Sequence, residues 1–222
     1  MTTNYEEKYT PKSIDDIIFA SEKSRSLIDQ LVKNIRPFPV KESKCGILLY
    51  GISGTGKSAL AKLLPDAIEK ARGGSEAFEK YVQVMPGENG LKLVKAIATQ
   101  AATVPYGQKY HYFVIDEADR LNDDAMNVLK SVMNIRNAIF ILTTNNYDAI
   151  EIGVRDRCYC IPFNAAPALN WLPFARNVLK DEGINGISDT TLEATLATAN
   201  GSARNIMEVL FDIIFEAKLA QH

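Results

Sequence analysis

One segment constrains this chain more than any other, because it matches the pattern G-x-x-x-x-G-K-[ST]. It consists of Gly51, Ile52, Ser53, Gly54, Thr55, Gly56, Lys57 and Ser58, and it lies between a short apolar run and a segment with helical periodicity. Glycines in such a turn let backbone N–H groups point inward at the positive end of a helix, where phosphate oxygens bind. The pattern predicts a phosphate-binding loop in which Lys57 reaches the β- and γ-phosphates of ATP and Ser58 holds Mg²⁺.

A second apolar run ends in carboxylates, with Asp116 and Glu117 directly after Tyr112–Ile115. Ligands of open α/β sheets bind at the carboxyl ends of the strands, so these acids are expected beside the phosphate loop. There Asp116 would hold Mg²⁺, and Glu117 would polarise the water that attacks the γ-phosphate. An acidic strand end can also be a cap or a solvated surface, but its pairing with the phosphate loop favours the functional interpretation.

Apolar runs alternate with helix-length segments as far as residue 163, and only helical patterns follow. Runs at 46–50, 80–85, 110–115, 138–143 and 159–162 predict parallel strands covered on both faces. Pro65 falls inside the helical pattern after the phosphate loop, so a kink or break is expected there. The sequence therefore predicts a three-layer α/β domain with a parallel sheet over 1–163 and a small all-helical lid domain over 164–222.

The composition excludes several classes of protein. A net charge of −2 argues against a surface that is basic throughout, so any contact with DNA must come from a local patch. Cys45, Cys158 and Cys160 do not form a disulfide framework or a zinc-type spacing, which favours free thiols in a reducing compartment. The amino terminus is polar and no apolar run is long enough to span a membrane, so a cytoplasmic protein is expected.

Five further segments carry a family resemblance. They are the amino-terminal stretch from Tyr5 to Ile18, Asp-Glu-Ala-Asp at 116–119, Phe-Ile-Leu-Thr-Thr-Asn at 140–145, Gly-Val-Arg-Asp-Arg-Cys at 153–158 and Gly-Ser-Ala-Arg at 201–204. With these motifs in order, the chain resembles the P-loop AAA+ ATPases, and within them the clamp-loader group of the replication factor C type. The resemblance extends from Tyr5 to about Phe215.

The resemblance implies roles for residues at matching positions. Tyr9, Pro11 and Ile18 would contact the adenine, and Asn145 would orient the attacking water. Arg204 would be directed at the γ-phosphate of its own subunit.

Arg157 takes the arginine-finger position of the family, which implies an oligomer because this residue would act on the nucleotide of a neighbour. Physical alternatives remain for both arginines. Arg155 and Arg157 can form surface ion pairs with Asp148, Glu151 or Asp156, and Arg204 can be a solvated residue at a helix start.

The resemblance implies an ATP-hydrolysing subunit that works in an oligomer on DNA, similar to a sliding-clamp loader of DNA replication. Its partners would be identical or homologous AAA+ subunits, a sliding clamp and the backbone of double-stranded or primer-template DNA. Lys92 and Lys95 lie on the polar face of the helix expected at 91–102, where they can meet phosphates or remain solvated surface charges.

Two alternatives stay open at this stage. One is a AAA+ helicase loader or a transposition or recombination regulator, and the other is an interaction subunit whose nucleotide site is structural. Clamp-loader subunits continue past the lid into a helical collar. No collar is expected here, which leaves the stoichiometry open.

Overall fold

The structure, a computed structural model, describes residues 5–40, 43–85 and 90–219. In these residues a parallel sheet has the strand order β2-β3-β4-β1-β5. The strands are β1 (Gly46–Tyr50), β2 (Glu79–Gln83), β3 (His111–Asp116), β4 (Ala138–Thr144) and β5 (Cys158–Pro162). Every residue of β3 and β4 is buried, as in parallel sheets that helices cover on both faces. The expected parallel α/β sheet is confirmed, with strand ends slightly different from the expected ones.

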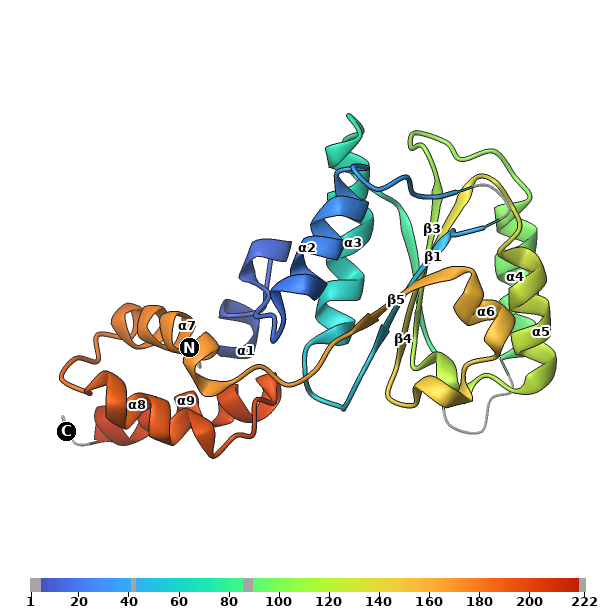
Figure 1. The fold of residues 1–222 in the computed structure, drawn as a ribbon. Coiled ribbons are helices and arrows are strands. Elements are labelled where there is room, and N and C mark those ends of the chain that lie inside the picture. Colours follow the sequence, from blue (N-terminus) through green and yellow to red (C-terminus); the bar gives the residue numbers. More distant parts are fainter. Residues whose placement is uncertain (1–4, 41–42, 86–89, 220–222) are drawn as a thin grey trace.

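Helices cover both faces of the sheet and give the three layers seen in Figure 1. One face carries α2 (Glu22–Val32) and α3 (Lys57–Ala71), and the other carries α4 (Leu91–Ala101), α5 (Asp123–Val132) and α6 (Ile152–Asp156). Because successive strand residues alternate between faces, Ile47 and Leu49 pack with α3 while Leu48 packs with α5. Short 3₁₀ turns lie at Ile14–Asp16 (η1), Ala118–Arg120 (η2) and Tyr147–Ala149 (η3).

Of the kink or break expected at Pro65, the break is wrong, because helix α3 continues through this residue. A proline in a helix interior removes a hydrogen bond and costs about 3 kcal/mol. Leu60, Leu64 and Ile68 on the same helix are fully buried against the sheet. Burial of each such side chain contributes about 1.5–3 kcal/mol. Tertiary packing therefore outweighs the local tendency of Pro65 to end the helix.

Between β5 and residue 219 the chain forms three helices that share a core of their own. They are α7 (Ala168–Asp181), α8 (Asp189–Ala197) and α9 (Ala203–Leu219), called the lid below. Ser188 caps α8, its hydroxyl accepting a hydrogen bond from the Thr191 amide at 3.1 Å. Helix α1 (Tyr5–Lys8) lies beside the lid in Figure 1, and Tyr5 packs on the lid core. We propose residues 163 and 164 as the boundary between the sheet domain and the lid.

Two further findings concern only the ranges 5–40, 43–85 and 90–219. The thiols of Cys45, Cys158 and Cys160 are free, with Cys45 and Cys158 buried. None of the helices in these ranges is both long and apolar enough to cross a lipid bilayer.

A buried carboxylate joins the amino-terminal segment to the lid. The side chain of Glu182, just after α7, is only 8% exposed. Its carboxylate accepts hydrogen bonds from Lys8 Nζ at 2.7 Å, from the Tyr9 hydroxyl at 2.9 Å and from Lys218 Nζ at 2.8 Å. Lys8 and Tyr9 belong to the amino-terminal segment and Lys218 belongs to α9, so one carboxylate links two distant parts of the sequence.

We expect this carboxylate to stabilise the fold over a defined pH range. Hydrogen bonds from Lys218 and Lys8 lower the pKa of Glu182 from 4.5 to about 2. Since the pKa is lower in the folded state, the contribution of Glu182 to the free energy of unfolding is complete above pH 4.5 and is lost as the pH falls toward 2. In urea unfolding, the parent and Glu182→Gln should differ most above pH 4.5 and converge toward pH 2. A difference that stays constant across this range contradicts the prediction.

Candidate active site

The loop between β1 and α3 depends on glycine for its path. Gly54 and Gly56 have φ angles of 80° and 99°, in the left-handed region that side chains disfavour. Gly51 has a φ of 150°, and a Cβ atom on it would lie 2.5 Å from the carbonyl oxygen of Phe163. The chain therefore wraps closely around the amino terminus of α3, where free N–H groups and the helix dipole favour an anion.

A lysine ammonium group lies inside this loop. Lys57 is 6% exposed, and its Nζ donates to the carbonyl oxygens of Gly51 at 2.9 Å and Ile52 at 2.6 Å. Burial lowers the pKa of Lys57, while the negative charges of Asp116 and Asp119 oppose that shift. The loop thus holds a positive charge at the position where the sequence motif requires one.

Asp116 is a buried carboxylate at the end of β3, 4% exposed. One oxygen accepts hydrogen bonds from Ser58 Oγ at 2.8 Å and from the Thr143 hydroxyl, and the other accepts from the Tyr81 hydroxyl at 2.7 Å. Ser58 and Asp116 thus bring two hard oxygen donors together, which fits Mg²⁺. No cluster of three or more His, Cys, Asp or Glu suited to a metal occurs in the described residues.

Glu117 follows Asp116 with a φ of 56°, a conformation uncommon for a residue other than glycine. Its amide donates to the Thr143 hydroxyl at 3.0 Å. Its carboxylate forms an ion pair with Arg120 and accepts a hydrogen bond from Gln83 Nε2 at 3.3 Å. These contacts place the carboxylate beside the phosphate loop and tie it to side chains of β2 and η2.

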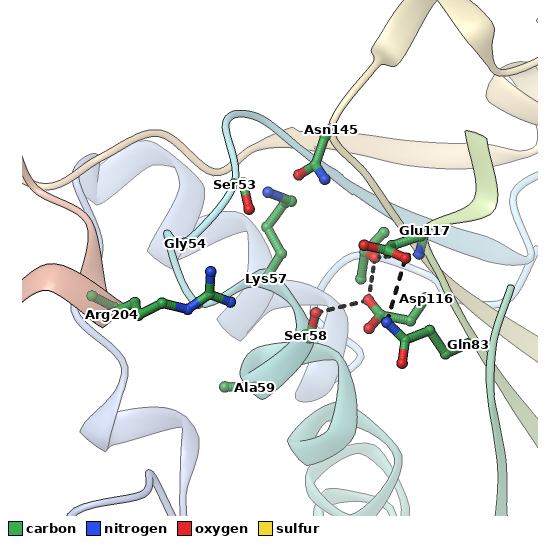
Figure 2. Close-up of a pocket in the computed structure, with 13 residues that line it drawn as sticks. Ser53, Gly54, Lys57, Ser58, Ala59, Gln83, Asp116, Glu117, Asn145 and Arg204 are labelled. Carbon is green, nitrogen blue, oxygen red and sulfur yellow. Dashed lines mark hydrogen bonds between the residues drawn. The ribbon is translucent and has the colours of Figure 1, made fainter. Parts of the chain in front are cut away.

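A cavity of about 300 Å³ brings most of the expected catalytic residues together. Figure 2 shows Lys57, Glu117, Asn145 and Arg204 around this cavity, coming from four different parts of the chain. Asn145 follows β4, and Arg204 begins α9 of the lid. Arg204 is exposed, and its side chain forms no hydrogen bond or ion pair within the described ranges. The residues that line the cavity are Ser53, Gly54, Gly56, Lys57, Ser58, Ala59, Gln83, Asp116, Glu117, Thr143, Asn145, Ala203 and Arg204.

A smaller cavity of about 110 Å³ adjoins the first and shares Gly56, Ala59 and Ala203 with it. Tyr9, Pro11 and Ile18, expected around an adenine, all line this cavity, as does Thr55 of the loop. The opposite wall comes from the lid and consists of Trp171, Phe174, Ala203 and Met207. The arrangement suits a flat apolar group attached to a phosphate chain in the larger cavity.

Sequence reasoning missed several residues of these two cavities. Gln83 of the larger cavity lies on β2 in register with Asp116 of β3, which only the strand pairing reveals. Trp171 and Phe174 are apolar residues of α7, which the sequence alone would place in the core of the lid. Gly51 and Ile52 line neither cavity, and their carbonyl groups hold Lys57 instead.

Arg157 lies at the amino-terminal ends of the parallel strands, whereas the loop lies at their carboxyl ends. It directly precedes β5, whose Cys158 is in register with Gly46 at the start of β1, whereas the loop follows the end of β1. Its guanidinium donates to the Asn134 side chain at 3.0 Å and to the Gly153 carbonyl at 2.8 Å. Within the described ranges it contacts no carboxylate, whereas Arg155 pairs with Asp148 at 3.4 Å. The ion-pair interpretation therefore applies to Arg155 and not to Arg157.

The expected DNA-contacting lysines also lie outside both cavities. Lys92 and Lys95 are exposed on α4, while Val94 and Ile97 of the same helix are fully buried. The helix therefore presents both ammonium groups on its solvent face.

The chain is similar to known proteins over most of its length. A family model described as "ATPase family associated with various cellular activities (AAA)" matches residues 47–162. Replication factor C small subunit 2 of Pyrobaculum islandicum is 28% identical over 209 residues, covering 92% of this chain and 61% of that protein. The replication factor C small subunit of Thermofilum pendens is 27% identical over 208 residues, covering 92% and 60%. The chain thus spans about three fifths of the length of these relatives.

Solved structures share the fold at low sequence identity. A mutant of Thermotoga maritima RuvB matches with a TM-score of 0.75 at 15% identity, covering 97% of this chain and 68% of that one. A DNA polymerase III gamma subunit-related protein of the same organism matches with a TM-score of 0.56 at 14% identity, covering 85% and 57%. These matches carry the arrangement of sheet and helices but no assignment of function.

Proposed function

Since the chain belongs to the AAA family of ATPases, we propose that it hydrolyses ATP with Mg²⁺ and does so in an oligomer that acts on DNA. The observation that supports hydrolysis is the larger cavity, where Lys57, Glu117, Asn145 and Arg204 meet. The resemblance to replication factor C small subunits favours a role as a subunit of a sliding-clamp loader in DNA replication.

The phosphate chain of ATP would bind in the loop, where Lys57 exchanges its contacts with the Gly51 and Ile52 carbonyl groups for β- and γ-phosphate oxygens. Hydrogen bonds between charged groups are stronger than those to neutral carbonyls, which favours this exchange. Ser58 and Asp116 would hold Mg²⁺, which neutralises charge that develops on the phosphates. The adenine would occupy the smaller cavity between Tyr9, Pro11 and Ile18 and the lid.

Glu117 would polarise the attacking water and accept its proton, with Asn145 orienting that water. In the structure the Glu117 carboxylate contacts the side chains of Arg120 and Gln83. Arg204 would contact the γ-phosphate of its own subunit, so that lid position depends on whether the phosphate is present.

Arg157 would serve the site of a neighbouring subunit. Arg157 lies at the amino-terminal ends of the strands and its own loop lies at their carboxyl ends. It would therefore reach only the γ-phosphate bound to a neighbouring subunit, across the interface between the two. Lys92 and Lys95 would meet the phosphates of double-stranded or primer-template DNA, a contact that is independent of base sequence and sensitive to salt. A cytoplasmic location and partners that include homologous subunits and a ring-shaped clamp belong to the same proposal.

Lys57→Ala tests the nucleotide site. Loss of a buried ammonium group that contacts phosphates should weaken ATP binding by about 100-fold, the equivalent of about 2.7 kcal/mol. Calorimetric titration with ATP and Mg²⁺ measures this effect. Lys70→Ala is a suitable control, because Lys70 lies at the far end of the same helix and pairs only with Asp66, at 3.7 Å, among the described residues. Equal affinity of the two variants for ATP would remove the proposed site.

The clamp-loader role has its own test. The mass of the assembly is measured with and without ATP, primer-template DNA and a candidate clamp. ATP-dependent binding of a clamp supports the proposal. Filaments that form on DNA and do not bind the clamp favour a helicase loader or a recombination regulator. Absence of turnover with every partner present would favour an interaction subunit.

A further inference from the structure

The smaller cavity has walls from two ends of the sequence. Tyr9, Pro11 and Ile18 come from the amino-terminal segment, and Trp171 and Phe174 come from α7 of the lid. A base in this cavity would contact both walls only while the distance between them is maintained. The contacts between the amino-terminal segment and the lid therefore fix the spacing of these two walls.

The first residues of the amino-terminal segment are held by the lid. Helix α1 has four residues, far below the length at which a helix is stable alone. Tyr5, Lys8 and Tyr9 contact the lid, whereas Ile14 and Ile17 further along the segment pack with α2 and α3. The Tyr5 ring packs 5.4 Å from the ring of Phe211, and the Tyr5 hydroxyl accepts a hydrogen bond from Lys218 at 2.9 Å.

Glu182 is the centre of these contacts. It receives donors from Lys8 and Tyr9 on one side and from Lys218 on the other, at 2.7–2.9 Å. Tyr9 belongs to both structures, because its hydroxyl binds Glu182 while the residue lines the smaller cavity. Glu182 itself lines neither cavity.

We propose that Glu182 is a positioning residue for the nucleotide base, because it fastens the amino-terminal wall of the smaller cavity to the lid through Tyr9 and Lys8. The inference rests on the proposed function, since it takes ATP as the ligand. It makes base binding depend on the contact between the amino-terminal segment and the lid, while the phosphates bind mainly to Lys57 and the phosphate loop of the sheet domain. Movement of the lid toward the γ-phosphate would thus carry one wall of the base site with it.

Two ligands separate the base from the phosphates. ATP fills both cavities, whereas inorganic tripolyphosphate has no base and uses only the larger one. Glu182→Gln should weaken ATP binding about tenfold, the loss expected when a charged hydrogen-bond acceptor is neutralised, and should leave tripolyphosphate affinity unchanged. Binding is measured by calorimetry. The fluorescence of Trp171, the one tryptophan of the chain, reports whether the smaller cavity is filled.

Asp189→Asn is the matched control. It breaks the ion pair of Asp189 with Arg176, which joins α7 to α8 within the lid and does not touch the amino-terminal segment. This variant should bind both ligands like the parent. Lys218→Met removes the lid donor to Glu182 and provides a second test, with the same selective loss of ATP affinity expected.

The outcomes divide clearly. A selective loss of ATP affinity in Glu182→Gln or Lys218→Met supports the inference. Equal losses for ATP and tripolyphosphate, unchanged ATP affinity, or failure of both variants to fold while Asp189→Asn folds would overturn it. If the parent protein binds neither ligand, the proposed function fails as well, which distinguishes that result from a failure of Glu182 alone.

Discussion

Replacing Arg157 with alanine is expected to lower ATP turnover by about 10³–10⁵-fold while leaving ATP affinity nearly unchanged. A guanidinium supplied from a neighbour stabilises the charge that develops on the transferred phosphoryl group, so its loss affects the transition state more than the bound substrate. In the structure Arg157 is far from its own loop in the sheet and contacts Asn134 and Gly153. The effect should therefore appear only in assembled protein, and the parent's turnover per subunit should rise with protein concentration.

A mixing experiment makes this prediction sharper. Arg157→Ala and Glu117→Gln should each be nearly inactive alone, but in a mixed assembly some sites would combine an intact Glu117 with an intact Arg157 from the neighbour. Activity should recover on mixing. Arg155→Ala is the control, because Arg155 pairs with Asp148 within its own subunit. This variant should lose little ATP turnover. No recovery, or equal loss in both arginine variants, contradicts a role in trans.

Glu117→Gln should retain ATP and slow its hydrolysis by about 10²–10⁴-fold, the usual contribution of a general base. The amide cannot accept the proton of the attacking water, but it keeps the size of the side chain. Its ion pair with Arg120 is also lost, so ATP affinity should be equal to or higher than that of the parent. Single-turnover measurements separate this chemical step from binding.

The control for this variant is Asp124→Asn, an exposed carboxylate at the start of α5. It removes the same charge from the neighbouring helix without touching the cavity, and turnover should match that of the parent. Hydrolysis by Glu117→Gln at the parental rate would mean that another group activates the water.

The sheet domain was predictable because its central strands are buried on both faces. Runs such as Ala138–Thr144 consist almost wholly of apolar and β-branched residues, and such runs fit few other structures. The error at Pro65 has the opposite origin. Local propensity favoured a break, but three fully buried side chains on α3 contribute more than the lost hydrogen bond costs.

The candidate site was predictable where its chemistry lies within one short segment. The loop from Gly51 to Ser58 and the pair Asp116–Glu117 each carry their own geometric requirement in sequence. The partners of those acids were not predictable, namely Gln83, Tyr81 and Arg120. The contacts of Gln83 and Tyr81 depend on the pairing of β2 with β3, and that of Arg120 depends on the turn η2 after β3.

The sequence by itself determined which groups can bind a phosphate and a metal ion, because those requirements are local: glycines that allow a turn, a lysine at a helix start and acids at the end of an apolar strand. Only the tertiary structure decided what surrounds them. It placed Arg157 at the ends of the strands opposite the loop, and it closed the smaller cavity with Trp171 and Phe174. It also buried the Glu182 side chain between the amino-terminal segment and α9. These outcomes depend on packing between residues distant in the chain, and no pattern along the sequence encodes which of them meet.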